Sequence, residues 1–239
     1  MTAEWTNELQ VYCADIGSIG RGNFAWASRH PPLLRHAVDP MSIESLAAAA
    51  LADLKGGRAV ALGFEMPLFL PVTMAPGKLG KARATDKDAP SWSSSTGASV
   101  MATGIVQAAW VLRSLFECLP AASITTSWDR FAAERDGLLV WEAFVTRGAK
   151  GVTHEEDAAI GVKAFCNQLP APGDAEADEV EGPLSLAAAI CVWAGWPLPP
   201  AELRQMGTLV RAKPRPECRA RSEAPLAKSQ SGEVDVCGI

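Results

Sequence analysis

The chain has 239 residues, of which 48% are hydrophobic and 21% are charged, and its formal net charge is −5. This length is about one and a half times the ~150 residues expected for one domain, so one domain with an appendage fits better than two domains. The apolar content is sufficient for a buried core and excludes a wholly disordered chain. The net charge excludes a protein that is basic throughout, but a local basic patch remains compatible with nucleic-acid binding.

The N-terminal residues, MTAEWTNELQ, are acidic and lack the apolar segment of a signal peptide. The two most apolar stretches are residues 99–119, which contain charged side chains, and residues 184–198, which are too short to cross a bilayer. We therefore expect a cytoplasmic protein with no membrane partner. The six cysteines form no CxxC pair, which favours reduced thiols over a disulfide frame or a zinc site.

Periodicity in the first half of the chain predicts strands, one helix and one long irregular segment. Strands are predicted at residues 9–15 and 23–29, near 35–38, and at 59–65. Ser42 is a suitable N-cap for a helix that extends to about residue 55, where Gly56 and Gly57 end it. The nearly continuous apolar run at residues 59–65 is typical of a central strand covered on both faces. Residues 66–98 have no clear period, which predicts a lid, a binding loop or a partly helical segment.

The second half alternates predicted helices and strands. Helices are predicted at residues 99–119, 153–169 and 185–196, with strands at 138–145 and near 207–212. Thr153 and Glu156 match a capping box at the start of the second of these helices. Residues 173–182 form an acidic loop, and residues 213–239 lack apolar periodicity. We therefore predict a domain over residues 1–212 and a disordered tail over residues 213–239.

This order of elements predicts an α/β fold with a mixed sheet flanked by helices. Three successive strands followed by alternating helices and strands is the order found in the ribonuclease H-like fold. In that fold the first strand lies between the second and the fourth. The ends of the first and fourth strands are therefore expected to be neighbours.

Three carboxylates occur in or at the end of strands that are otherwise apolar. Asp15 ends the first strand, Glu65 ends the fourth, and Glu142 lies within LLVWEAFV. Burying a carboxylate that has no partner costs free energy, so such residues call for an explanation. Each residue also has a structural explanation, since Asp15 could be a turn residue, Glu65 could be solvated and Glu142 could pair with a basic residue.

Asp157 is the fourth carboxylate, and it lies on a predicted helix. It shares a helix face with Ile160, Gly161 and Ala164, at offsets of three, four and seven residues. That face is expected to point to the core, although Asp157 could also simply stabilise the helix N-terminus. A divalent cation would compensate all four carboxylates together, and ligands that are all oxygen favour Mg²⁺ or Mn²⁺ over zinc.

Further residues are candidates for substrate contacts. Ser18 and Asn23, on the Gly-rich turn after Asp15, could contact a scissile phosphate, and His154 could lie at the rim of the site. Lys78, Lys81, Arg83 and Lys87 could contact phosphates from the long segment, although a solvated charged loop is the simpler explanation. The basic residues between Arg211 and Lys228 could add non-specific attraction to nucleic acid.

These residues together resemble a known family. DIGSIGRGNFAWA, ALGFEMPLFLPV, SWSSSTGASVMATG, LVWEAFV, THEEDAAIGVKAF and SLAAAICVWAG follow one another as in the domain of unknown function numbered 429, an uncharacterised family of predicted ribonuclease H-like nucleases. The likeness spans roughly residues 10–212. It implies that the acidic motif positions are Asp15, Glu65, Glu142 and Asp157. The acidic insertion and the tail depart from the family pattern.

Three functions are compatible with this sequence. The first is a nuclease in which two Mg²⁺ or Mn²⁺ ions, roughly 3.5–4 Å apart, act on a phosphodiester, with Asp15 bridging the ions. The second is a nucleotide-binding or phosphotransfer protein of the actin-like fold, which the DIGS turn resembles, although that fold needs two lobes. The third is a non-catalytic interaction module, against which the presence of all four acids argues.

Overall fold

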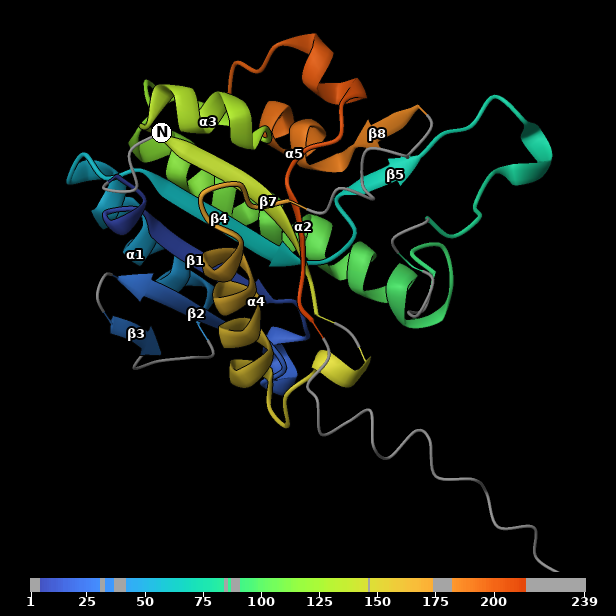
Figure 1. Ribbon diagram of the computed structural model, residues 1–239, viewed down its shortest axis with the longest axis horizontal. Helices are drawn as coiled ribbons and strands as arrows, with labels where there is room; N and C mark the ends of the chain where they lie inside the picture. Colours follow the sequence, from blue (N-terminus) through green and yellow to red (C-terminus); the bar gives the residue numbers. More distant parts are fainter. Residues whose placement is uncertain are drawn as a thin grey trace, which may run out of the picture.

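The computed structural model describes residues 5–30, 33–36, 42–83, 86, 91–145, 147–173 and 182–213. Its centre is a mixed sheet with the strand order β3-β2-β1-β4-β7-β6, and β9 also pairs with β7 (Figure 1). The strands are β1 (Gln10–Asp15), β2 (Ala25–His30), β3 (Leu33–His36), β4 (Val60–Glu65), β6 (Ile124–Thr125), β7 (Leu138–Phe144) and β9 (Leu209–Arg211). The predicted α/β class and mixed sheet are therefore confirmed.

The position of β1 is the feature that builds the site. β1 pairs antiparallel with β2 and parallel with β4, as the order of elements predicts. β4 in turn pairs parallel with β7, so β1, β4 and β7 all end at the same edge of the sheet. β6 pairs with the start of β7 and β9 with its end, both in parallel.

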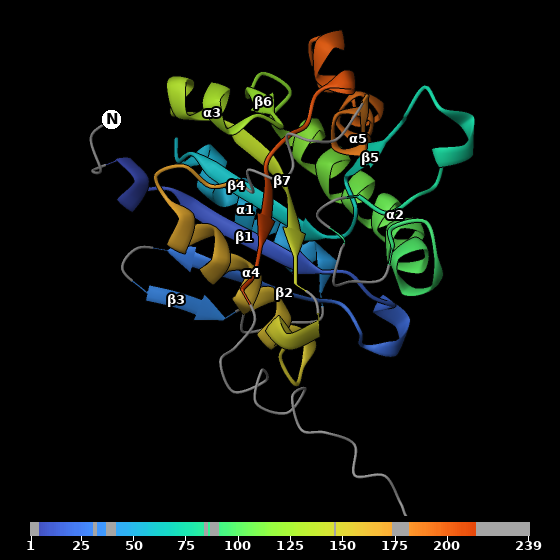
Figure 2. The ribbon, with the colours of Figure 1, turned by 45° about the vertical axis from the view of Figure 1, so that its right-hand side comes forward.

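Helices cover both faces of this sheet (Figures 1 and 2). The helices are α1 (Ile43–Lys55), α2 (Ser95–Cys118), α3 (Trp128–Glu134), α4 (His154–Gln168) and α5 (Leu186–Ala194). Side chains of α1, α2 and α5 form one apolar core with residues such as Leu62, while α3 and α4 form a second with residues such as Trp141. The sheet is therefore buried on both faces, which explains the nearly continuous apolar runs of β4 and β7.

Most predicted boundaries agree with the structure to within a few residues, because local signals define them. The Ser42 hydroxyl accepts a hydrogen bond from the backbone N–H of Ser45 at 3.2 Å, which caps α1 as predicted. Thr153 likewise caps α4 by accepting from Glu156 N at 3.3 Å, but the Glu156 carboxylate accepts from Val152 N instead of closing the expected box. The sequence did not predict α3 or β6.

The long segment after β4 is partly ordered into secondary structure. It contains β5 (Phe69–Pro71), which pairs antiparallel with β8 (Pro183–Ser185) in a second, two-stranded sheet. α2 then begins at Ser95, several residues earlier than predicted, and by length and composition it could cross a membrane. Core helices pass the same test, and here α2 packs on the sheet with α1 and α5.

Four cysteines lie in the described part of the chain, and all four are free thiols. Cys13 and Cys191 are buried, whereas Cys118 is exposed. The predicted tail from residue 214 onward, residues 174–181 of the acidic loop, and Lys87 lie outside the described residues.

Candidate metal centre

Three of the four predicted acids converge at the carboxyl edge of the sheet. Asp15 and Glu65 are register partners at the ends of β1 and β4, so both project from the same face of the sheet. Asp157 approaches from the first turn of α4 on that face. One oxygen from each of the three carboxylates lies within 4.8 Å of the other two, a spacing at which the three groups could hold a metal ion.

A glycine allows α4 to lie close enough to deliver Asp157. A Cβ atom at Gly161 would lie only 2.5 Å from Sγ of Cys13 on β1, a separation that side chains do not tolerate. Asp157 itself is buried, with 5% of its surface exposed, as its position on the core-facing stripe predicts. The packing of Gly161 against the sheet therefore fixes the distance from the helix to the two strand carboxylates.

We call the three carboxylates of Asp15, Glu65 and Asp157 the acidic cluster. Two basic side chains contact it. The ammonium group of Lys150 lies 3.3 Å from Glu65 Oε1 and 3.0 Å from Asp157 Oδ2. Nδ1 of His154 makes a short contact with Asp15 Oδ2, and the imidazole remains 43% exposed. The rim position proposed for His154 is thus consistent with the structure. Lys150 was not predicted from the sequence, because this residue lies in a short irregular segment. The one signal for a role at the site is its position shortly before Thr153, the N-cap of α4.

Asp157 is better compensated than the sequence suggests. Besides Lys150, its Oδ1 accepts a hydrogen bond of 2.6 Å from the backbone N–H of Gly151. Asp157 therefore has one side-chain donor and one backbone donor. Within the acidic cluster, the buried Oε2 of Glu65 has no hydrogen-bond partner among the described residues.

The electrostatics of the acidic cluster favour an additional cation. Burial raises the pKa of Glu65 well above its ordinary value, and the neighbouring Asp15 carboxylate raises it further. Burial also raises the pKa of Asp15, although His154 and Lys150 oppose this shift. For Lys150, burial acts to lower the pKa, but the surrounding carboxylates outweigh it and raise the pKa. The three carboxylates outnumber the two basic side chains that contact them, so an additional cation would stabilise the acidic cluster.

The fourth predicted acid, Glu142, lies on the opposite face of the sheet. It pairs in register with Phe64, which packs in the core with α1 and α2, whereas Glu65 is the next residue and faces α4. The prediction that Glu142 joins the other acids is wrong by one position, because successive side chains of a strand point to opposite faces.

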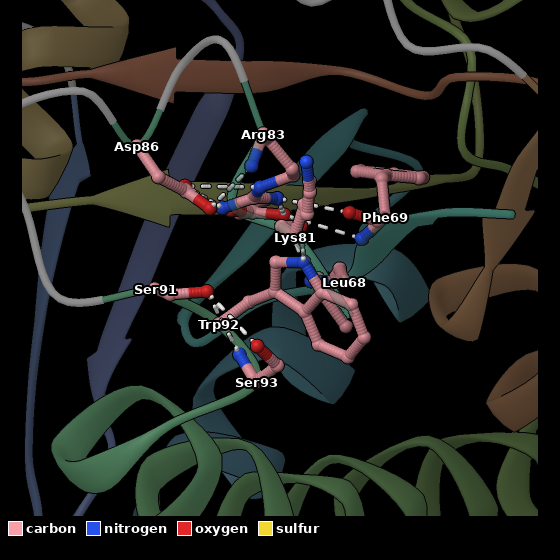
Figure 3. A network of polar contacts seen from close by, with 9 residues as sticks. Leu68, Phe69, Lys81, Arg83, Asp86, Ser91, Trp92 and Ser93 are labelled. Carbon is pink, nitrogen blue, oxygen red and sulfur yellow. Dashed lines mark hydrogen bonds and ion pairs between the residues drawn. The ribbon is translucent and has the colours of Figure 1, made fainter. Parts of the chain in front are cut away.

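Glu142 instead forms a buried ion cluster with Arg83 and Asp86. Figure 3 labels Arg83 and Asp86 in this cluster. The guanidinium group lies 2.8 Å from Glu142 Oε1 and 2.9 Å from Asp86 Oδ1, and it also donates to the carbonyl of Phe69 at 3.0 Å. Burial raises the pKa of Glu142, while Arg83 opposes that shift. The backbone N–H of Leu68 donates a further hydrogen bond of 2.8 Å to Glu142.

The other predicted substrate contacts have different outcomes. Arg83 is only 3% exposed and fully engaged in the ion cluster, so its predicted role in phosphate contact is wrong. Lys78 and Lys81 are exposed on the long segment and remain accessible. Ser18 and Asn23 are exposed on the turn after Asp15, where the Ser18 carbonyl accepts from the backbone N–H of Asn23 at 2.9 Å.

No protein-family model, curated protein or solved structure matches this chain. Its function must therefore be inferred from its residues and their geometry. The donor set of the acidic cluster consists of carboxylate oxygens with one imidazole at the rim. Hard divalent cations prefer such oxygen ligands, and the buried Oε2 of Glu65 is available to one.

Proposed function

We propose that this protein is a metal-dependent nuclease that hydrolyses phosphodiester bonds at the acidic cluster. The observation that carries the proposal is the convergence of Asp15, Glu65 and Asp157, whose oxygens lie within 4.8 Å of one another. The strand order, with β1 between β2 and β4, supports a ribonuclease H-like fold and is consistent with the family resemblance of the sequence. Fold alone does not determine activity, so the carboxylate geometry is the main support.

The donor set suits Mg²⁺ or Mn²⁺. Asp15, Glu65 and Asp157 would hold the ions. When bound, such ions supply Lewis-acid stabilisation of the phosphate and an activated water. The overall reaction would be hydrolysis, in which water supplies a hydroxyl group to phosphorus and a proton to the leaving oxygen.

The remaining residues of the site have supporting roles in this proposal. His154 would hold Asp15 in place, and its partly exposed imidazole lies where substrate could reach it. Lys150 would supply positive charge against the approaching phosphate, because its side chain is 46% exposed. Ser18 and Asn23, exposed on the turn after Asp15, would face the nucleic-acid backbone.

The test is metal-dependent cleavage of labelled single-stranded and duplex DNA and RNA, with EDTA, Mg²⁺ or Mn²⁺. We expect cleavage only with metal, and a loss of at least about a hundredfold in Asp15→Asn, since second-shell changes alone cost about 10–100-fold. Glu155→Gln is the matched control, because Glu155 lies in the same helix turn as Asp157 but outside the acidic cluster. Absence of cleavage and of any metal-induced rise in melting temperature would refute the proposal. Binding of ATP in that case would favour the phosphotransfer alternative.

A further inference from the structure

A cavity of about 290 Å³ opens directly beside the acidic cluster. Glu65 of the acidic cluster lines it, and so does Lys150, which forms ion pairs with that cluster. Its other walls are mainly apolar and include the side chains of Met66, Trp92 and Phe144. A ligand in this cavity would therefore be in contact with both an apolar surface and the candidate metal centre.

Fixed elements of the fold build the walls of this cavity. They come from the ends of β4 and β7 and from the first turns of α2. α2 fits closely because Gly104 leaves room for Met66, whose Sδ would lie 2.3 Å from a Cβ at that position. The cavity is thus held by the packing of the core.

The buried ion cluster secures the remaining wall. Arg83 and Asp86 both line the cavity, and Arg83 ties the long segment to Glu142 on β7. The indole N–H of Trp92 donates to the carbonyl of Lys81 at 2.9 Å, which anchors the ring to the same segment (Figure 3). Glu142 holds Arg83 in place and so contributes to the shape of this cavity, although Glu142 lies outside the metal centre.

We propose that this cavity receives one unpaired nucleobase of a single-stranded nucleic-acid substrate. This inference rests on the proposed function, because it places the phosphodiester next to that base at the acidic cluster. The cavity volume of about 290 Å³ is close to the lower limit of the ~300–1,000 Å³ typical of ligand pockets. A cavity of this size suits one planar ring system. Aromatic side chains such as Trp92 and Phe144 are the surfaces on which bases stack without strong sequence preference.

The start of α2 forms part of the cavity wall. Thr96 and Gly97 line the cavity from the first turn of α2. The backbone N–H groups of a first helical turn have no partner within the helix, and Ser94 makes no side-chain cap here. A base paired in a duplex cannot enter without leaving its stack, which is energetically costly. The protein is therefore expected to favour single strands over duplexes.

The test uses a variant that fills the cavity and a matched control on the same helix. Val100→Trp places a large side chain in the cavity, whereas Val106→Trp makes the same change at an exposed position of α2 outside it. Trp92→Ala removes an aromatic wall without adding bulk. The probes are a short single-stranded oligothymidylate and an abasic oligomer of the same length, with binding measured in EDTA.

We expect Val100→Trp and Trp92→Ala to weaken oligothymidylate binding by about fivefold or more, because stacking one base on an aromatic side chain contributes at least about that factor. Binding of the abasic oligomer should be weaker in the wild type and unchanged in both variants. Val106→Trp should bind both probes as the wild type does. The rise in melting temperature with Mn²⁺ should persist in all variants, which shows that the fold and the acidic cluster are intact.

Equal binding of both probes by the wild type, or unchanged oligothymidylate binding in Val100→Trp and Trp92→Ala, would overturn the inference. Cleavage of oligothymidylate with Mn²⁺ separates this failure from that of the proposed function. If the wild type cleaves and the cavity variants cleave and bind equally well, only the cavity inference fails. If binding depends on the base and on the cavity but no cleavage occurs, only the nuclease proposal fails. If neither binding nor cleavage occurs, both are wrong.

Discussion

Replacement of Arg83 by methionine tests the assignment of Glu142 to a structural ion cluster. Arg83 and Glu142 have side chains with 0% exposure, and Asp86 has 1%. Methionine keeps much of the apolar volume of the arginine stem but removes the positive charge. The carboxylates of Glu142 and Asp86 then remain buried, with Glu142 retaining only its hydrogen bonds from backbone N–H groups.

The loss of one partner from a buried ion pair costs about 3–5 kcal/mol, since it leaves an uncompensated charge. Two stranded carboxylates place Arg83→Met toward the upper end of that range. At about 2–4 °C for each kcal/mol in a protein of this size, the melting temperature should fall by roughly 6–20 °C. Urea denaturation followed by circular dichroism measures the free energy directly.

Two comparisons make this result specific. Arg113→Met removes an exposed pair with Glu117, whose side chains are 47% and 59% exposed, and should cost less than about 1 kcal/mol. Adding Glu142→Gln to Arg83→Met should recover part of the loss, because it removes one stranded charge. A cost for Arg83→Met no larger than that for Arg113→Met would refute this account of the cluster. Loss of Mn²⁺ binding in a folded Glu142→Gln variant would show that Glu142 is a ligand after all.

Three further predictions concern the acidic cluster. Burial and the neighbouring Asp15 carboxylate raise the pKa of Glu65, so above the ordinary carboxyl range the folded protein binds more protons than the unfolded chain. Metal-free stability should therefore fall as the pH rises above that range. Glu65→Gln should flatten this dependence in urea titrations with EDTA, and an unchanged slope would contradict the assignment. Gly161→Ala should destabilise the protein by about 1–3 kcal/mol in thermal melts, since its Cβ would lie 2.5 Å from Cys13 Sγ; no loss would mean that α4 can shift freely. Lys150→Met should lower metal-free stability, because it removes the ion pairs with Glu65 and Asp157. It should also increase the rise in melting temperature with Mn²⁺, because the ammonium group no longer competes with the metal. A smaller rise would instead show that Lys150 assists metal binding.

The part of the site that the sequence predicts is the part fixed by regular structure. Asp15 and Glu65 end two strands that the order of elements makes neighbours, and Asp157 occupies a face defined by helical periodicity. Glu142 was misplaced because β7 is apolar on both faces, so its sequence does not reveal which residues face α4. A strand with one polar face would have resolved this ambiguity.

The residues that could not be predicted act across long distances in the sequence or from irregular segments. Arg83 pairs with Glu142, which is 59 positions away, and nothing in a segment without periodicity indicates that a basic residue is buried there. Lys150 reaches Glu65 from the turn before α4, where no pattern defines its direction. α3 has only seven residues, too few for an amphipathic period to be recognised.

The acidic cluster combines two kinds of support with different freedom to move. Asp15 and Glu65 are held by adjacent hydrogen-bonded strands, whose separation of about 4.7–4.9 Å is set by the backbone and changes little with side-chain substitution. Asp157 is carried by a helix, whose distance from the sheet depends on the side chains between them. The position of α4 relative to the sheet is therefore the part of the site that side-chain substitutions can change. Substitutions beneath α4 would change the size of the ion that the three carboxylates accept, and discrimination between small Mg²⁺ and larger Ca²⁺ could evolve without any change to the ligands themselves.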